Sequence, residues 1–249
     1  MLPTPSTSHV NFENVYEPAE DSFLLIDTLS GATETAWLHK RFSCRCTALT
    51  LLEVGTGSGV VLGFVTSWAK KIFGRRDILT FGTDVNRMAS QASARTVRQA
   101  VTASDEQPDR TTSAVFADTV MADLTSCMRV DDVDILIFNP PYVPTEELPD
   151  ILDGEFTSDF ERDSHLLALS YAGGDEGMET TNRLLDQLPS MLSPQRGVAY
   201  VLLCAQNKPK DVKARIRLWG DGWRAETVGD SGKKGGWEKL QIIRIWREP

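Results

Sequence analysis

Residues 49–59 have the sequence LTLLEVGTGSG, in which an apolar run leads into closely spaced glycines. The run ends at Glu53-Val54, and glycines follow at positions 55, 57 and 59. The run is typical of a buried strand, and the glycines let the next turn approach a ligand without a Cβ atom in the way. A dinucleotide-binding fingerprint would require glycine at position 60, where this chain has Val60. The alternative interpretation is a tight strand-to-helix turn that binds nothing.

Short apolar runs alternate with segments of helical spacing through the rest of the chain. Besides the strand at 49–54, we predict strands at 78–83, 113–117, 133–138 and 197–205, and a closing antiparallel pair at 223–228 and 240–246. We predict helices at 58–73, 86–101, 175–192 and 209–219, and loops at 103–112 and between Tyr142 and Asp175. This alternation predicts an α/β fold with a doubly wound, mostly parallel seven-stranded sheet.

Composition and charge restrict the class of protein. The chain has 249 residues, of which 41% are hydrophobic and 24% charged, so we expect one domain over residues 15–249. Residues 1–14 are rich in Pro, Ser and Thr and are expected to be a disordered tail. The chain shows neither a signal peptide nor a run of 18 apolar residues, so we expect a cytoplasmic or nuclear protein without membrane contact. The net charge of -9 disfavours direct nucleic-acid binding.

Cysteines and histidines give little indication of a metal site. Cys44 and Cys46 are the only closely spaced cysteines, and their spacing is not that of a zinc knuckle. The three histidines are scattered along the chain. We therefore expect no metal ion in this protein.

Acidic residues end three successive predicted strands. Glu53 closes the first, Asp84 follows the second and Asp118 follows the third. Ligands of such sheets bind at the carboxyl ends of the strands, where Asp84 could accept hydrogen bonds from a ribose diol and Asp118 could face an adenine amino group. As alternatives, Asp84 could cap the next helix and Asp118 could be a turn residue.

The most specific motif is Asn139-Pro140-Pro141-Tyr142, directly after the fourth strand. Two prolines make a stiff loop, as a site with defined geometry requires. A planar amide or aromatic amino nitrogen is a poor nucleophile because its lone pair is delocalised. The carbonyls of Asn139 and Pro140 could accept its two N–H groups, orient it and stabilise the positive charge that develops. The ring of Tyr142 could stack on the planar group.

With these motifs the chain resembles the HemK-type glutamine N5-methyltransferases, which modify peptide-chain release factors and carry Asn-Pro-Pro-Tyr as their catalytic signature. The segments YEPAEDSF (16–23), LEVGTGSGV (52–60) and YAGGDEG (171–177) are similar to the short eukaryotic and archaeal branch. The resemblance extends from about Val15 to Trp246. It implies a class I methyltransferase fold, S-adenosylmethionine as cofactor, and the glutamine of the Gly-Gly-Gln motif of the class-1 release factor as substrate. It also implies a heterodimer with a small zinc-binding activator subunit, and absence of the helical N-terminal domain found in bacterial relatives.

The resemblance implies a role for each matching residue. Ser22 should close over the cofactor, and its methionine end should be lined by Glu53, Gly55 and Gly57. Asp84 should bind the ribose, and Asp118 with Thr119 should bind the adenine. Asn139 should contact the cofactor side as well. Catalysis is implied for Asn139, Pro140 and Tyr142, and substrate binding for Asn139, Pro140, Pro141 and Tyr142.

Other functions use similar motifs and must be weighed. A nucleic-acid methyltransferase acting on adenine N6 or guanine N2 could use the same four residues, Asn139 to Tyr142, which we call the tetrad. Such an enzyme needs a basic groove that receives a flipped base. A protein lysine methyltransferase gains nothing from two amide acceptors, because its nucleophile must lose a proton. A scaffold that binds cofactor without catalysis would not need the intact tetrad.

Two surface features suggest how protein partners bind. The strand at 113–117 has neither lysine nor proline to blunt an exposed sheet edge, so an activator could add a strand there. Residues 145–163 include one base, Arg162, and are expected to attract a basic peptide. The acids of this segment are Glu146, Glu147, Asp150, Asp153, Glu155, Asp159, Glu161 and Asp163.

Overall fold

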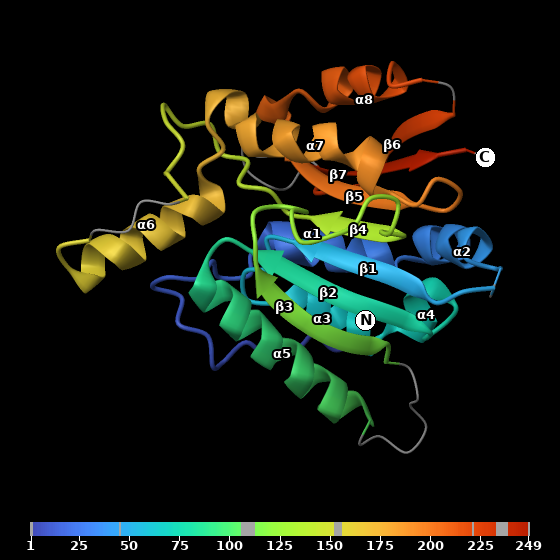
Figure 1. Cartoon of the computed structure of the whole chain (residues 1–249), viewed down its shortest axis with the longest axis horizontal. Helices are drawn as coiled ribbons and strands as arrows, with labels where there is room; N and C mark the ends of the chain where they lie inside the picture. The colour runs from blue at the N-terminus through green and yellow to red at the C-terminus, as the bar shows by residue number, and fades with distance from the viewer. Residues whose placement is uncertain are drawn as a thin grey trace.

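The computed structural model describes residues 2–44, 46–105, 113–151, 156–220, 222–232 and 239–248. They form a seven-stranded sheet in the order β3-β2-β1-β4-β5-β7-β6 (Figure 1). Its strands are β1 (Leu49–Val54), β2 (Ile78–Asp84), β3 (Val115–Met121), β4 (Ile135–Phe138), β5 (Val198–Cys204), β6 (Trp223–Asp230) and β7 (Leu240–Arg247). Strands β1 to β5 run parallel, and β7 pairs antiparallel with both β5 and β6. The predicted α/β fold with a closing antiparallel strand is therefore confirmed.

Helices cover both faces of this sheet. One face packs against α1 (Glu20–Ser30), α2 (Ala32–Arg41), α3 (Val60–Ser67), α4 (Ala69–Phe73) and α5 (Arg87–Asp105), and the other against α7 (Glu179–Met191) and α8 (Pro209–Arg217). Burial on both faces explains why β5, VAYVLLC, is apolar without alternation and buried at every residue. The strand order reverses between β1 and β4, and in such sheets the ligand crevice opens beside that point.

Several helices differ from the prediction. Helix α6 (Asp159–Tyr171) lies in the segment we expected to be a loop. None of its residues is buried, and it projects away from the sheet, so its sequence lacks the wide apolar face that identifies a packed helix (Figure 1). The helix predicted at 58–73 is divided at Trp68 into α3 and α4, and a 3-10 turn (Asp175–Gly177) precedes α7. Helices α1 and α2 were not predicted.

Residues 2–14, expected to be a disordered tail, lie against α3 and α5. The indole nitrogen of Trp68 donates a hydrogen bond to the carbonyl of Pro3 at 3.1 Å. Val10 packs in one apolar cluster with Ala89 of α5. The side-chain amide of Asn86 donates a hydrogen bond to the carbonyl of Asn14 at 2.7 Å. Main-chain carbonyls and a few apolar side chains thus hold an extended segment whose composition alone suggested no core contact.

Cys44 and Cys46 are joined by a disulfide bond. The described part of the chain holds no group of three or more His, Cys, Asp and Glu side chains placed to bind a metal ion. Within the same residues, every helix is too short or too polar to cross a membrane.

Candidate active site

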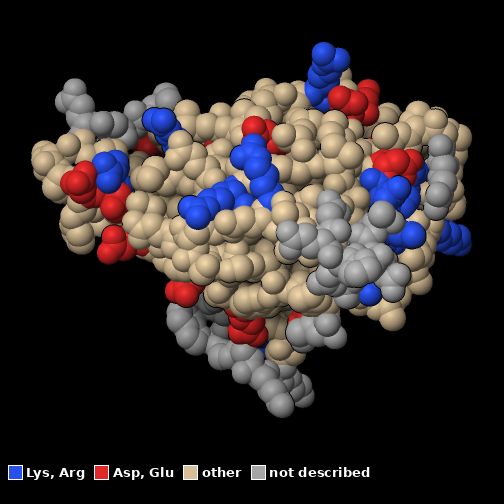
Figure 2. Space-filling view, turned by 90° about the horizontal axis from the view of Figure 1, so that it is seen from below, with Lys and Arg blue, Asp and Glu red and all other residues tan. Residues whose placement is uncertain are grey.

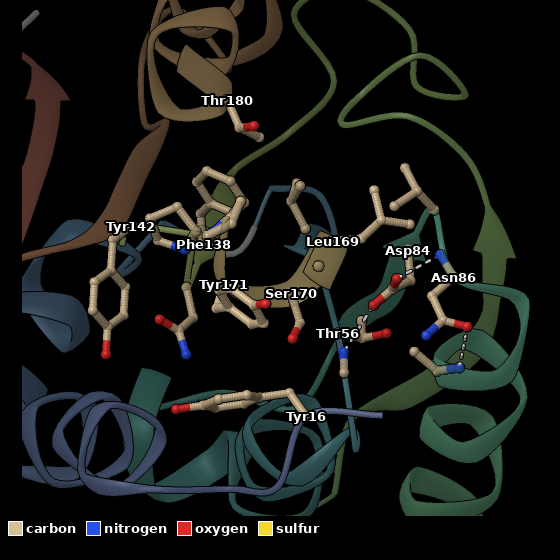
Figure 3. Close-up of a pocket in the computed structure, with 18 of the residues that line it drawn as sticks. Tyr16, Thr56, Asp84, Asn86, Phe138, Tyr142, Leu169, Ser170, Tyr171 and Thr180 are labelled. Carbon is tan, nitrogen blue, oxygen red and sulfur yellow. Dashed lines mark hydrogen bonds between the residues drawn. The ribbon is translucent and has the colours of Figure 1, made fainter. Parts of the chain in front are cut away.

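A cavity of about 330 Å³ opens at the carboxyl ends of β1, β2 and β4. Figure 3 shows Tyr16 on one side of it, with Leu169, Ser170 and Tyr171 of α6 across from it. The sheet places most of the predicted site residues in this wall, although they lie far apart in the chain. The predicted residues that line it are Ser22, Glu53, Gly55, Gly57, Asp84, Asn139, Pro140, Pro141 and Tyr142.

The glycine-rich turn after β1 has the backbone that only glycine adopts easily. Gly55, Gly57 and Gly59 have φ of 65°, 51° and 79°. A Cβ atom at Gly59 would lie 2.5 Å from the Cα of Ser93 in α5, so this glycine lets the turn pack on that helix. A Cβ atom at Gly57 would meet no atom within 4 Å. Glycine is therefore required at position 57 for its left-handed backbone conformation, which directs the Gly57 amide to Asp84.

Asp84 ends β2 in a buried position. Its two carboxylate oxygens accept hydrogen bonds from the amides of Gly57 (2.9 Å) and Asn86 (2.8 Å). Burial raises the pKa of Asp84 to about 6, although both amide bonds favour the ionised form and oppose that rise. The residue also links the glycine turn to the start of α5, where the Asn86 side chain accepts from the amide of Met88 at 2.8 Å. Of the two residues that could cap this helix, Asp84 and Asn86, it is the Asn86 side chain that accepts from amides of its first turn.

At the end of β1 and in the turn after it, two polar atoms of the cavity wall are buried without a partner among the described residues. They are Oε2 of Glu53 and Oγ1 of Thr56. Burial raises the pKa of Glu53 well above its usual range, and the nearby charge of Asp84 adds to this. Unsatisfied buried polar atoms are costly, so these two indicate a ligand that brings hydrogen-bond donors. The amino group of a methionine moiety is a donor of this kind.

Asn139 is fixed by a residue that sequence reasoning did not assign. Its Nδ2 donates to Oδ2 of Asp21 at 3.1 Å, and the hydroxyl of Tyr16 donates to the same oxygen at 3.0 Å. Because a carboxylate only accepts, these bonds assign the amide nitrogen to the side of Asp21. Oδ1 of Asn139 is left buried and without a partner among the described residues. The site thus presents a preorganised acceptor.

Asp21 also organises Ser22, which the sequence placed over the cofactor. Its Oδ1 accepts from the amide of Ser22 at 2.6 Å and from the Ser22 hydroxyl at 3.2 Å. Asp21 is 2% exposed, so it is a buried acid whose oxygens are all bonded. Both Tyr16 and Asp21 belong to the segment YEPAEDSF, and that segment was the signal that could have identified them.

The structure places the two residues predicted for the adenine side, Asp118 and Thr119, away from the cavity. Asp118 and Thr119 lie within β3 and not after it, because Ala117 forms a bulge between Phe116 and Asp118 and the strand continues to Met121. Neither residue lines the cavity, and Asp118 forms an exposed ion pair with Arg98.

The acid that follows β3 in the structure is Asp123. It lines the cavity with Ala122 and Leu124 and forms an ion pair with Arg183 of α7. The sequence contains Ala-Asp at 117–118 and again at 122–123, and an exposed edge strand has no apolar pattern to show where it ends.

Apolar residues from the segment before and within α6 complete the cavity wall. This wall is formed by Leu148, Pro149, Ile151, Leu166, Leu169 and Tyr171. The segment expected to be a loop therefore borders the site, as predicted, but does so partly as a helix. An apolar wall opposite a row of hydrogen-bonding groups suits a ligand with one planar face and several polar atoms.

Comparisons with known proteins agree with this geometry. No family model matches the chain. It is 34% identical to the eRF1 methyltransferase catalytic subunit of Schizosaccharomyces pombe, with 99% of this chain and 96% of that protein covered. It is 33% identical to human methyltransferase HEMK2, with 97% and 95% covered.

A solved structure shares the fold at lower identity. The chain matches the Mtq2 chain of the E. cuniculi Mtq2–Trm112 complex, described as responsible for methylation of the eRF1 translation termination factor. The TM-score is 0.55 at 22% identity, over 95% of this chain and 99% of that one. This match supports the class I methyltransferase fold.

Proposed function

This chain belongs to the methyltransferase family of HEMK2 and the eRF1 methyltransferase catalytic subunit, and from this we propose its reaction. It transfers a methyl group from S-adenosylmethionine to the side-chain amide nitrogen of the glutamine in the Gly-Gly-Gln motif of the class-1 release factor. The observation that carries the proposal concerns Asn139, which lines the cavity: its Oδ1 is buried and has no partner among the described residues, while its Nδ2 is bonded to Asp21.

The residues of the cavity fit the proposed cofactor. Glu53 and Thr56 would accept from the amino group of its methionine part, Asp84 from its ribose hydroxyls, and Asp123 from its adenine amino group. The cofactor supplies an electrophilic methyl group on a sulfonium. The buried pair Glu53 and Asp84 favours a cationic ligand electrostatically, because positive charge makes both acids easier to ionise.

The tetrad would orient the substrate amide. Oδ1 of Asn139 and the carbonyl of Pro140 accept its two N–H groups, and these bonds strengthen as positive charge develops on nitrogen. Bound S-adenosylmethionine would supply the methyl group to this nitrogen and be left as the neutral thioether, and the proton that the nitrogen gives up would pass to water. Because Asp21 already fixes Asn139, little reorganisation is needed, and catalysis comes mainly from positioning.

The alternatives fit the observations less well. A nucleic-acid substrate requires a basic groove, and the chain carries a net charge of -9. On the face shown in Figure 2, the basic side chains stand in small separate groups, several with acidic ones beside them. A lysine nucleophile would need a group that takes its proton, whereas the tetrad offers acceptors suited to an amide.

The proposed activity has a direct test. The protein would be incubated with labelled S-adenosylmethionine and the release factor, with and without the activator subunit, and the methyl group located by peptide mass spectrometry. We expect label on the glutamine of the Gly-Gly-Gln motif and none on a factor with that glutamine changed to alanine. Label on a lysine, or on added RNA or DNA in place of the factor, would contradict the proposal.

We also propose that a small zinc-binding activator subunit adds a strand to β3. This strand is at one edge of the sheet and pairs only with β2 among the described strands. Val115 and Met121 are 61% and 62% exposed, and Leu79 of the neighbouring β2 is 36% exposed. A strand with unpaired edge groups and exposed apolar side chains is a template for pairing with another chain.

Hydrogen exchange tests this docking mode. Amides of β3 should exchange more slowly when the activator is bound, with roughly tenfold or greater protection, because pairing adds hydrogen bonds and buries the edge. Strand β6, at the opposite edge, is the internal control and should not change. Equal exchange at Val115 and Phe116 with and without activator would rule out this mode.

The acidic segment beside the cavity is proposed to bind the basic surroundings of the substrate loop. Glu146, Glu147 and Asp150 are exposed next to the cavity-lining residues Leu148 and Pro149. In the following helix, Arg162 forms ion pairs with Asp159 and Asp163, so the charge of that pair of acids is partly compensated. Asp153 and Glu155 lie outside the described residues. The exposed acids Glu146, Glu147 and Asp150 therefore border the cavity wall.

Neutralising these acids should weaken substrate binding without slowing the chemical step. We expect the combined change Glu146→Gln, Glu147→Gln, Asp150→Asn and Asp153→Asn to raise KM for the release factor roughly three- to tenfold at low salt, with little change in kcat. The difference should shrink as salt rises through about 0.1–0.5 M, because screening shortens the reach of exposed charges. Asp131→Asn with Asp132→Asn, exposed acids just before β4, is the matched control. Equal low-salt KM values for mutant and wild type would remove this role.

A further inference from the structure

Asn207 is a buried side chain that touches the tetrad from behind. It ends the 3-10 turn Ala205–Asn207 that follows β5, is 1% exposed and does not line the cavity. Its Oδ1 accepts from the amide of Cys204 at 2.7 Å. Its Nδ2 donates to the carbonyls of Tyr142 (3.1 Å) and Glu176 (2.9 Å). The side chain therefore uses its donors to join the end of the tetrad to the turn before α7.

The tetrad depends on its carbonyls for this kind of support. Pro140 and Pro141 have no amide hydrogen, so neither can anchor the loop by donating a bond. At the other end of the tetrad, Asn139 is held through its side chain by Asp21. At the Tyr142 end, the carbonyl accepts from the Asn207 amide at 3.1 Å and from the Cys204 thiol at 3.9 Å. The Val143 amide next to it donates to the carbonyl of Tyr171 at 3.0 Å, so Asn207 is the nitrogen donor that acts on the tetrad itself.

Two glycines shape the surface on which these carbonyls lie. A Cβ atom at Gly173 would be 2.5 Å from the carbonyl oxygen of Pro141. A Cβ atom at Gly177, where φ is 67°, would be 2.0 Å from the carbonyl oxygen of Tyr142. No other residue type could occupy these positions without moving the tetrad. The segment YAGGDEG thus packs its backbone directly on the loop that is proposed to hold the substrate.

The backbone on either side of these contacts is strained. Glu176, whose carbonyl accepts from Asn207, has φ of 52°, and Lys208, the next residue after Asn207, has φ of 50°. The side chains of Glu176 and Lys208 form an ion pair. Non-glycine residues keep such conformations only where the surrounding structure imposes them. Here the imposed geometry brings the Glu176 carbonyl and the Asn207 amide together.

We propose that Asn207 is a positioning residue for methyl transfer, which sets the Tyr142 peptide group and thereby the Pro140 carbonyl and the Tyr142 ring. This inference rests on the proposed reaction at the tetrad. Asn207 lies away from the residues assigned to the cofactor, so it should affect the rate of transfer and leave cofactor binding unchanged. A misplacement of a catalytic group by about 1 Å can reduce a rate by roughly 100-fold.

The test compares Asn207→Asp with wild type in kcat, in cofactor Kd by calorimetry and in Tm. Aspartate has the same shape and can still accept from Cys204, but its ionised oxygen faces two carbonyls in place of a donor. We expect kcat to fall roughly 100-fold at saturating cofactor and release factor, with cofactor Kd unchanged. Gln206→Glu makes the same amide-to-acid change at the exposed neighbour in the same 3-10 turn, so it is the matched control and should keep wild-type kcat.

A second variant keeps the test informative if Asn207→Asp does not fold. Asn207→Ser adds no charge, but its shorter side chain loses both the Nδ2 donor and the Oδ1 that accepts from Cys204. The same separation of kcat from cofactor Kd is expected, with a smaller loss. A folded variant with wild-type kcat would overturn the inference, and so would parallel losses of kcat and cofactor affinity. Absence of turnover by the wild type on the release factor would instead contradict the proposed function, and this inference with it.

Discussion

Replacing Asn139 with alanine should slow methyl transfer by roughly 100- to 1,000-fold while the protein stays folded, because removing one preorganised group from such a site costs about 3–4 kcal/mol. The change deletes Oδ1, which is buried and unpartnered among the described residues and is proposed to accept the substrate amide. It also deletes Nδ2, which donates to Asp21. Single-turnover rates with bound cofactor would measure the effect on the chemical step itself.

Controls separate loss of the acceptor from loss of the fold. Asn182→Ala removes an asparagine of α7 that bonds to Arg215 and does not line the cavity, so it should keep the wild-type rate. Asp21→Asn should also slow transfer, because an amide beside Nδ2 would allow Asn139 to rotate its carbonyl away from the substrate. If Asn139→Ala kept more than about a tenth of the wild-type rate, the proposed role of the tetrad would be wrong.

Replacing Asp84 with alanine should weaken S-adenosylmethionine binding roughly 10- to 150-fold. A hydrogen bond to a charged group contributes about 1.5–3 kcal/mol, and Asp84 also holds the amides of Gly57 and Asn86. Calorimetry on the purified protein gives the dissociation constant. Asp118→Ala is the control and should leave the dissociation constant unchanged, because the structure places that acid on the exposed edge strand, outside the cavity. An unchanged constant for Asp84→Ala would assign the ribose to another residue.

The same carboxyl predicts how cofactor affinity depends on pH. Its pKa is about 6, so Asp84 is ionised above pH 7 and becomes protonated as pH falls through 6. Only the ionised form accepts from both ribose hydroxyls, so affinity should decline as pH falls through 6. The pKa of Glu53 is also raised, and its protonation acts in the same direction. Asp84→Ala should therefore flatten the profile without removing it.

The sequence alone was sufficient for the features that short-range chemistry controls. The continuous apolar run of β1, the acid that ends it and the glycines after it predicted a parallel strand leading into a ligand-binding turn. Asn139 to Tyr142 predicted the reactive loop, because paired prolines between an amide and an aromatic residue have few purely structural uses. In each case the residues that matter are contiguous, so their order along the chain carries the information.

Other parts of the site could be decided only by the tertiary structure. Asp118 and Asp123 belong to equivalent Ala-Asp pairs in the sequence. The bulge at Ala117 and the continued pairing to β2 determine which of the two acids lines the cavity. Helix α6 lacks a buried face, so its sequence has no pattern that distinguishes it from a loop. Only the tertiary structure shows that its apolar residues line the cavity.

The two side chains that hold the tetrad in place also could not be identified from the sequence. Asp21 is 118 residues from Asn139 and Asn207 is 65 residues from Tyr142, yet each pair is joined by a hydrogen bond. Neither side chain carries a sequence signal of its own, since a buried Asp or Asn is defined by the partner that folding brings to it. The sequence determined the reactive groups and the sheet that displays them. Long-range packing decided which distant side chains hold those groups in place, because that depends on strand register and loop closure, which no local pattern encodes.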